Sequence, residues 1–100
     1  MLAKGVSPRL YYLRTKGGLE VDLLIEGRAG VLHPFEFKLT RTPRREMGDA
    51  IARFRSEFGK LNPAPGGLVT LSDHDAPLTR DARLMPLSVF LSKAGILSLT

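Results

Sequence analysis

Two acidic residues and a lysine in the first forty positions have the types and spacing for metal-assisted phosphate chemistry. Asp22 lies in "EVDLLIE", and Glu36 and Lys38 lie in "PFEFK", within segments that are otherwise largely apolar. Two carboxylates held side by side repel each other, and a hard cation such as Mg²⁺ or Mn²⁺ relieves that repulsion. A metal polarises a phosphoryl oxygen, and an adjacent ammonium stabilises charge that develops in the transition state. This combination is suited to phosphodiester hydrolysis.

Whether the three groups meet depends on how two predicted strands, 20–26 and 31–39, pair with each other. Antiparallel partners have a constant sum of residue numbers, and only an even sum places Asp22 and Glu36 on the same face. A four-residue loop over 27–30 gives an odd sum, whereas a five-residue connection or a bulge gives an even one. A slip of one residue would bury the charges, so the even sum is required.

We therefore predict a five-residue connection or a bulge, with Asp22 opposite Glu36 and Glu20 opposite Lys38, where the last two could form an ion pair. The alternation also predicts an apolar core face made of six side chains: Val21, Leu23, Ile25, Phe35, Phe37 and Leu39. The opposite face of the two strands carries the charged residues, together with Leu24.

The rest of the chain predicts the elements that position these groups. After a lead-in over 1–8, a first strand over 9–15 completes a three-stranded meander over 9–39, and Pro34 favours an edge or a bulge for the third strand. A helix is predicted over 42–59, with Thr42 as N-cap and Pro43 in its first turn. Its apolar stripe is Met47, Ile51, Phe54 and Phe58, while Arg53 and Arg55 are expected to be ordinary surface residues.

The closing segment, 67–100, predicts a buried strand at 68–71, a last strand at 82–87 and a short terminal helix at 87–95. The order of elements predicts a single domain over 1–100 of the α/β class, or of the α+β class. In either class a helix covers one face of a mixed sheet.

Composition narrows the possible partners of this domain. Fifteen Lys and Arg against ten Asp and Glu give a net charge of +5, which points to nucleic acid such as DNA or only to a soluble surface. Arg41, Arg44 and Arg45 could grip phosphates near the start of the helix, although an ordinary solvated surface is the favoured interpretation. Tyr11 and Tyr12 could stack on bases, but strand neighbours point to opposite faces, so one of them is expected in the core.

The absence of cysteine excludes disulfides and thiolate metal sites, and no apolar run is long enough to span a membrane. We expect a cytoplasmic protein.

The segments "YYLRTKGGLEVDLLIE" and "HPFEFKLTRTPRRE" carry a resemblance to a known family. The spacing from Asp22 to Glu36 and Lys38 resembles the D…(D/E)-x-K motif of restriction-endonuclease-like nucleases. More closely, the two segments resemble the C-terminal domain that follows an AAA-type ATPase in a large prokaryotic family. "GGLVTLS" and "LMPLSVFL" are similar to that family's closing parts, so the resemblance covers about 9–92.

The resemblance implies Asp22 and Glu36 as metal ligands, the Phe37 carbonyl as a third oxygen ligand, and Lys38 as the group that positions the attacking water. Glu20 matches the first acid of the family's E-V-D. The resemblance also implies an ATPase domain ahead of this segment, although no G-x-x-x-x-G-K-[ST] motif occurs here. We therefore expect an excised or separate domain.

The first helix of the nuclease superfamily is missing as well, because eight residues before the first strand cannot supply it. One sheet face is then expected to be uncovered, which favours a homodimer or packing on the ATPase. Three functions stay open: a nuclease-like domain, a catalytically silent nucleic-acid-binding module, and a protein-interaction or regulatory domain that docks on its ATPase.

Overall fold

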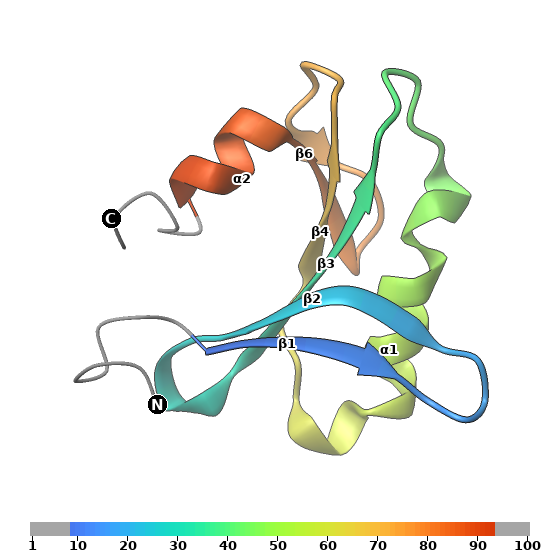
Figure 1. The fold of residues 1–100 in the computed structure, drawn as a ribbon, viewed down its shortest axis with the longest axis vertical. Helices are drawn as coiled ribbons and strands as arrows, with labels where there is room; N and C mark the ends of the chain where they lie inside the picture. The colour runs from blue at the N-terminus through green and yellow to red at the C-terminus, as the bar shows by residue number, and fades with distance from the viewer. Residues whose placement is uncertain (1–8, 94–100) are drawn as a thin grey trace.

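The computed structural model describes residues 9–93, and the predicted lead-in over 1–8 and the segment 94–100 lie outside the described residues. Figure 1 shows a twisted sheet with helices beside it. The strands are β1 (Arg9–Arg14), β2 (Glu20–Glu26), β3 (Leu32–Lys38), β4 (Gly66–Thr70), β5 (Ala76–Pro77) and β6 (Ala82–Pro86). The helices are α1 (Asp49–Glu57) and α2 (Leu87–Lys93), and three short 3₁₀ turns are η2 (Arg28–Gly30), η3 (Arg45–Gly48) and η4 (Gly59–Leu61).

The six strands form one mixed sheet in the order β1-β2-β3-β4-β6-β5. β1, β2 and β3 are antiparallel, as the predicted meander requires, and β3, β4 and β6 then run parallel. α1 lies in the connection between the parallel strands β3 and β4, where a crossover of this kind is needed. The chain is therefore an α+β domain with a mixed sheet and a helix packed against it, one of the two predicted classes.

The two helices lie on opposite faces of the sheet (Figure 1). Phe54 of α1 packs with Leu24 in one buried cluster, and Phe90 of α2 packs with Ile25 in another. Leu24 and Ile25 are neighbours on β2, so their side chains point to opposite faces. The expectation of one uncovered face is therefore wrong in part, because α2 covers the strands β4 and β6 on the second side.

The predicted core face of β2 is also wrong in part. Val21 belongs to the cluster around Phe54, whereas Leu23 and Ile25 belong to the cluster around Phe90. The cause is an irregularity in pairing, because the register moves from Tyr11 opposite Leu24 to Leu13 opposite Val21. Two steps along β1 thus match three steps along β2, and an extra residue of this kind changes which face later side chains occupy.

Pro34 lies in an inner strand, which corrects the predicted edge position. It is buried and pairs with Leu24, and its carbonyl oxygen faces the start of β4. The parallel ladder with β4 begins only at Phe35, opposite Gly67, so the missing N–H costs no ladder bond there. A β-carbon on Gly66 would lie 1.8 Å from the Pro34 oxygen, so this close approach requires glycine.

The predicted helix over 42–59 is shorter in the structure. Thr42 is not its N-cap, because the Thr42 N–H donates to the hydroxyl of Thr40 in a local turn and Arg44 is extended. The chain then makes η3, and α1 begins at Asp49 with Gly48 in the N-cap position. The predicted stripe nevertheless faces inward, since Ile51 and Phe54 are buried.

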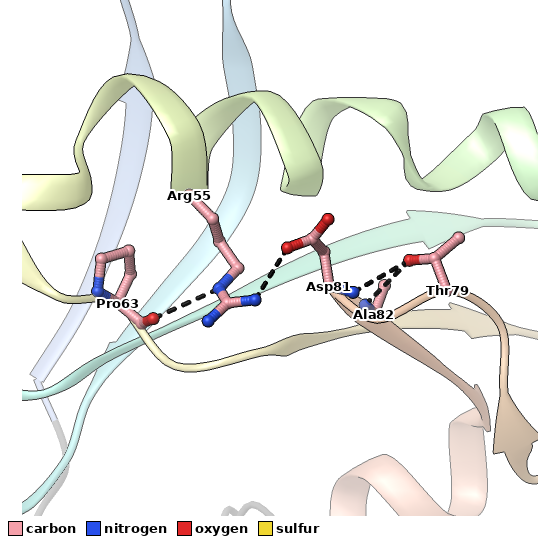
Figure 2. Close-up of polar contacts among 5 residues, drawn as sticks. All are labelled: Arg55, Pro63, Thr79, Asp81 and Ala82. Atoms are coloured by element: carbon pink, nitrogen blue, oxygen red, sulfur yellow. Dashed lines mark hydrogen bonds and ion pairs between the residues drawn. The ribbon is translucent and has the colours of Figure 1, made fainter.

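Arg55 is not the ordinary surface residue predicted. Its guanidinium donates to the carbonyl of Pro63 at 3.2 Å and pairs with Asp81 at 2.7 Å, and both charged groups are largely buried (Figure 2). Thr79 accepts the N–H groups of Asp81 and Ala82 and so fixes the turn before β6. This network ties α1 to the segment 76–82, where the sequence predicted no strand and the structure has β5.

Both closing strands were predicted correctly. Every residue of β4 is buried, as expected of a strand inside the sheet, and β6 lies beside it. None of the helices among the described residues is long and apolar enough to span a membrane.

Candidate metal and phosphate site

Asp22 and Glu36 face each other where β2 and β3 separate. The β2–β3 pairs run from Glu26 opposite Leu32 to Leu23 opposite Phe35, so the residue numbers have an even sum. The connection between the strands is five residues long, over 27–31. The predicted register is therefore confirmed, and its continuation brings Asp22 next to Glu36.

Beyond the last ladder pair, the two carboxylates take over the bonding between the strands. The Asp22 N–H donates to Glu36 Oε2 at 3.0 Å, and the Phe37 N–H donates to Asp22 Oδ2 at 2.9 Å. Each side chain thus accepts from the opposite strand, where a carbonyl would accept in a regular ladder. This exchange holds the two acids close together and leaves one further oxygen on each for another partner.

Glu36 is the most unusual ionisable group of the site. The residue is 6% exposed, between Asp22 on β2 and Leu68 on β4. Burial raises the pKa of its carboxyl from 4.5 to about 7, the nearby Asp22 charge adds to the rise, and the Asp22 N–H and the Lys38 ammonium oppose it. A buried carboxyl with a raised pKa beside a second acid is typical of functional sites.

An open cleft of about 440 Å³ lies over these acids. Charged groups dominate its lining: Glu20, Asp22, Glu36, Lys38, Asp49 and Arg53. The last two come from α1 and were missed as site residues. The spacing of four between Asp49 and Arg53 was a signal, because residues four apart lie on one face of a helix.

Arg53 does more than line the cleft. Its guanidinium donates to the carbonyl of Gly17 at 3.1 Å and pairs with Glu57 on the same helix. The contact with Gly17 joins α1 to the turn between β1 and β2, so Arg53 fixes two walls of the cleft relative to each other. Arg53 is exposed, as predicted, but it also lines the cleft.

The predicted ion pair between Glu20 and Lys38 is absent. Glu20 instead accepts from the Tyr12 hydroxyl at 3.1 Å and pairs with Arg14 at 3.4 Å, both across the β1–β2 hairpin. β2 and β3 diverge beyond Asp22, which gives Glu20 nearer partners on β1. Within residues 9–93 Lys38 forms no ion pair, and it is exposed at the cleft.

The three arginines predicted to grip phosphates do not line the cleft. Arg41 donates to the Leu71 carbonyl at 3.4 Å, and Arg44 pairs with Glu46 at 3.3 Å. Arg45 is exposed in η3. All three precede α1 rather than start it, because the helix begins later than predicted.

The donor set suits a hard cation with few protein ligands. Among the described residues, no group of three or more His, Cys, Asp or Glu side chains could hold a metal, so the two carboxylates are the charged ligands on offer. Mg²⁺ is commonly held by one or two carboxylates and by oxygens of water and phosphate. Asp22 and Glu36, with an open cleft above them, match that coordination preference.

Comparison with known proteins places the chain in a family. No curated protein and no solved structure matches it significantly. A family model described as "Domain of unknown function (DUF4143)" matches residues 2–90, which is most of the chain. This chain, with its mixed sheet and the cleft over Asp22 and Glu36, belongs to the DUF4143 family.

Proposed function

We propose that this domain is a restriction-endonuclease-like nuclease domain that hydrolyses phosphodiester bonds of DNA with the help of Mg²⁺ or Mn²⁺. One observation carries the proposal: Asp22 and Glu36, remote in sequence, meet in a cleft that Lys38 also lines. The Asp22 N–H donates to Glu36 Oε2 at 3.0 Å, and Asp22 Oδ2 accepts the Phe37 N–H at 2.9 Å. The net charge of +5 favours an anionic substrate.

The residues divide into roles by their chemistry. The free oxygens of Asp22 and Glu36, with the Phe37 carbonyl, hold the cation, which supplies Lewis acidity toward a phosphate. The Phe37 ring packs edge-on against Phe90 at 5.2 Å, so its backbone is anchored beside the cleft. Lys38 orients the attacking water, and Glu20 is a further acid at the rim.

The cleft walls keep these groups in place. Arg53 holds the β1–β2 turn against α1, and the phosphate of a bound strand would lie between that arginine and Lys38. Both are cationic, so they favour an anion at the cleft while the acids favour the metal. This division of charge is what a metal-dependent phosphodiesterase needs.

Plasmid nicking tests the proposal. With Mn²⁺, we expect the chain to relax supercoiled DNA, and Lys38→Ala and Asp22→Asn to lower the rate by about a hundredfold or more. Asp73→Asn, which changes an exposed loop acid outside the cleft, is the matched control. Equal rates for Lys38→Ala and the control would refute the assigned role of the lysine, and a wild-type chain without nicking would refute the catalytic proposal.

A second function, DNA binding without cleavage, is favoured by a different observation. Both carboxylates already accept backbone N–H groups, and burial raises the pKa of Glu36 to about 7, so the acids also serve as structural links between β2 and β3. This function predicts salt-dependent DNA affinity that persists in Asp22→Ala. Loss of binding in that variant would count against it.

The resemblance also supports an ATPase domain as a partner of this domain, either ahead of it in a longer chain or as a docked protein. In that setting the cleft acts on DNA that the ATPase engages, or the domain regulates its partner. Failure to bind DNA even at low salt would leave the regulatory function as the better account.

A further inference from the structure

The two edges of the sheet differ in how they are protected. β5 forms one edge with two residues, and one of them is Pro77, which has no N–H to offer a new strand. β1 forms the other edge with six residues, "RLYYLR", and contains no proline or lysine. Natural sheets usually block a long exposed edge, because unpaired N–H and C=O groups recruit another strand. Within residues 9–93 no further strand pairs with the β1 edge, and its charged side chains stand only at its two ends, Arg9 and Arg14.

The side chains of β1 are as exposed as its backbone. Leu10, Tyr11 and Tyr12 are 49%, 44% and 57% exposed, so the expectation that one tyrosine lies in the core is wrong. A groove of about 470 Å³ borders the strand and is lined mainly by apolar residues, among them Leu13 and Leu61. Contiguous apolar surface of this kind marks an interaction site.

Both tyrosines are held in place by the neighbouring strand. The Tyr11 hydroxyl donates to Glu26 at 2.8 Å, and the Tyr12 hydroxyl donates to Glu20 at 3.1 Å. Rings fixed in this way lose little further freedom when a partner covers them, which favours binding. The β1 edge is therefore preorganised for contact.

Two copies of β1 can pair antiparallel with apolar side chains opposed at the centre of the strands. If a two-fold axis runs perpendicular to the sheet, each face of one copy continues into the same face of the other. Residues that oppose each other across two antiparallel β1 strands must then have residue numbers with an even sum. A sum of 22 sets Tyr11 opposite its own copy and Leu10 opposite Tyr12; a sum of 24 sets Tyr12 opposite its own copy and Tyr11 opposite Leu13. Both registers oppose apolar or aromatic side chains at their centre, and at the flank Arg9 faces Leu13 in the first and Arg14 faces Leu10 in the second.

Charge does not oppose this pairing. Neither even register sets one arginine of β1 opposite another. The two arginines are also paired within the chain, Arg9 with Glu26 at 4.0 Å and Arg14 with Glu20 at 3.4 Å. Like charges directly opposite each other would destabilise the strand pair, and the two registers avoid them.

We propose that β1 pairs antiparallel with β1 of a second copy of this chain, which joins the two sheets into one continuous sheet about a two-fold axis. The inference is independent of the proposed function, because the hydrolytic cleft takes no part in it. It assigns the exposed tyrosines to a dimer interface rather than to base stacking.

Single-cysteine variants test this pairing cleanly, because the natural chain has no cysteine. Under mild oxidation, we expect Tyr11→Cys or Tyr12→Cys, depending on the register, to form a disulfide-linked dimer. Ala76→Cys on β5, at the opposite edge of the sheet, is the matched control and is expected to stay monomeric. Equal cross-linking at Ala76, or none at either tyrosine position, overturns the proposal.

Equilibrium sedimentation supplies an independent test. We expect the wild-type chain to dimerise reversibly, and Tyr12→Lys to raise the dimer dissociation constant at least about tenfold, since each dimer carries the new edge charge twice. Leu39→Lys changes an 85% exposed leucine outside β1 and controls for general loss of apolar surface. A monomeric wild type, or equal dissociation constants for Tyr12→Lys and wild type, overturns the proposal.

Discussion

Replacing Glu36 by glutamine tests the energetic account of the site most directly. The carboxyl holds its proton more tightly when folded, with a pKa of about 7, than when unfolded, with a pKa near 4.5. Protonation therefore stabilises the fold: the contribution is fully present below about pH 4.5 and is lost as the pH rises through about 7. The difference between 4.5 and about 7 corresponds to about 3 kcal/mol, at about 1.4 kcal/mol per pKa unit.

Glutamine mimics the protonated acid, because its amide oxygen can still accept the Asp22 N–H and it carries no charge. We expect Glu36→Gln to match the wild type near pH 4.5 and to be more stable at pH 8 by up to about 3 kcal/mol. A domain of this size has about 5–15 kcal/mol of total stability, so the effect is measurable.

The assay is urea unfolding followed by circular dichroism at several pH values in the presence of EDTA. Glu20→Gln removes one exposed acid and controls for the change in net charge. A stability difference between Glu36→Gln and wild type that stays constant with pH, or that favours the wild type at pH 8, would refute the account of Glu36 as a buried acid.

The same variants separate burial from metal binding. At pH 8, Mg²⁺ should restore stability to the wild type, because a bound cation favours the charged carboxylate, and should do so much less for Glu36→Gln. If Mg²⁺ has the same effect on both proteins, the burial account survives while the proposed cation site fails.

Three other substitutions test how the fold positions the cleft, each by the change in free energy of unfolding. Gly66→Ala should cost at least about 3 kcal/mol or prevent folding, because its β-carbon would lie 1.8 Å from the Pro34 oxygen. Gly59→Ala is the control and should change stability by less than about 1 kcal/mol, because nothing lies within 4 Å of that β-carbon. Similar losses of stability in the two variants would contradict the close approach. Arg55→Met should cost about 1–3 kcal/mol by leaving Asp81 without its partner, and a double-mutant cycle with Asp81→Asn that shows no coupling would contradict the pair. Phe90→Ala should cost about 3–5 kcal/mol by emptying the cluster beneath α2, and a loss below about 1 kcal/mol would contradict its packing.

Local periodicity explains what could be read from the residues alone. The alternation in β2 and β3, and the need to keep acids out of the core, required an even register and therefore a five-residue connection or a bulge, of which the structure has the five-residue connection. The apolar stripe identified the inward face of α1, and the run "LVTL" identified an inner strand. These features depend on residues close in sequence or on a period of two, so no knowledge of the packing was needed.

The remaining features depend on groups that only the tertiary structure brings together. One irregular step in the β1–β2 pairing places Val21 on the face opposite to Leu23 and Ile25. Because β2 diverges from β3, Glu20 accepts a hydrogen bond from Tyr12 and does not pair with Lys38. The packing of α1 added Asp49 and Arg53 to the cleft.

The sequence by itself determined that Asp22 and Glu36 would lie on the same face of the two strands, because a two-residue side-chain period permits only one parity. The tertiary structure decided how deeply Glu36 is buried and what shares its cleft. Burial depends on the summed packing of strands and helix, which has no local signature, and it is burial that raises the pKa of this acid and so sets its chemistry.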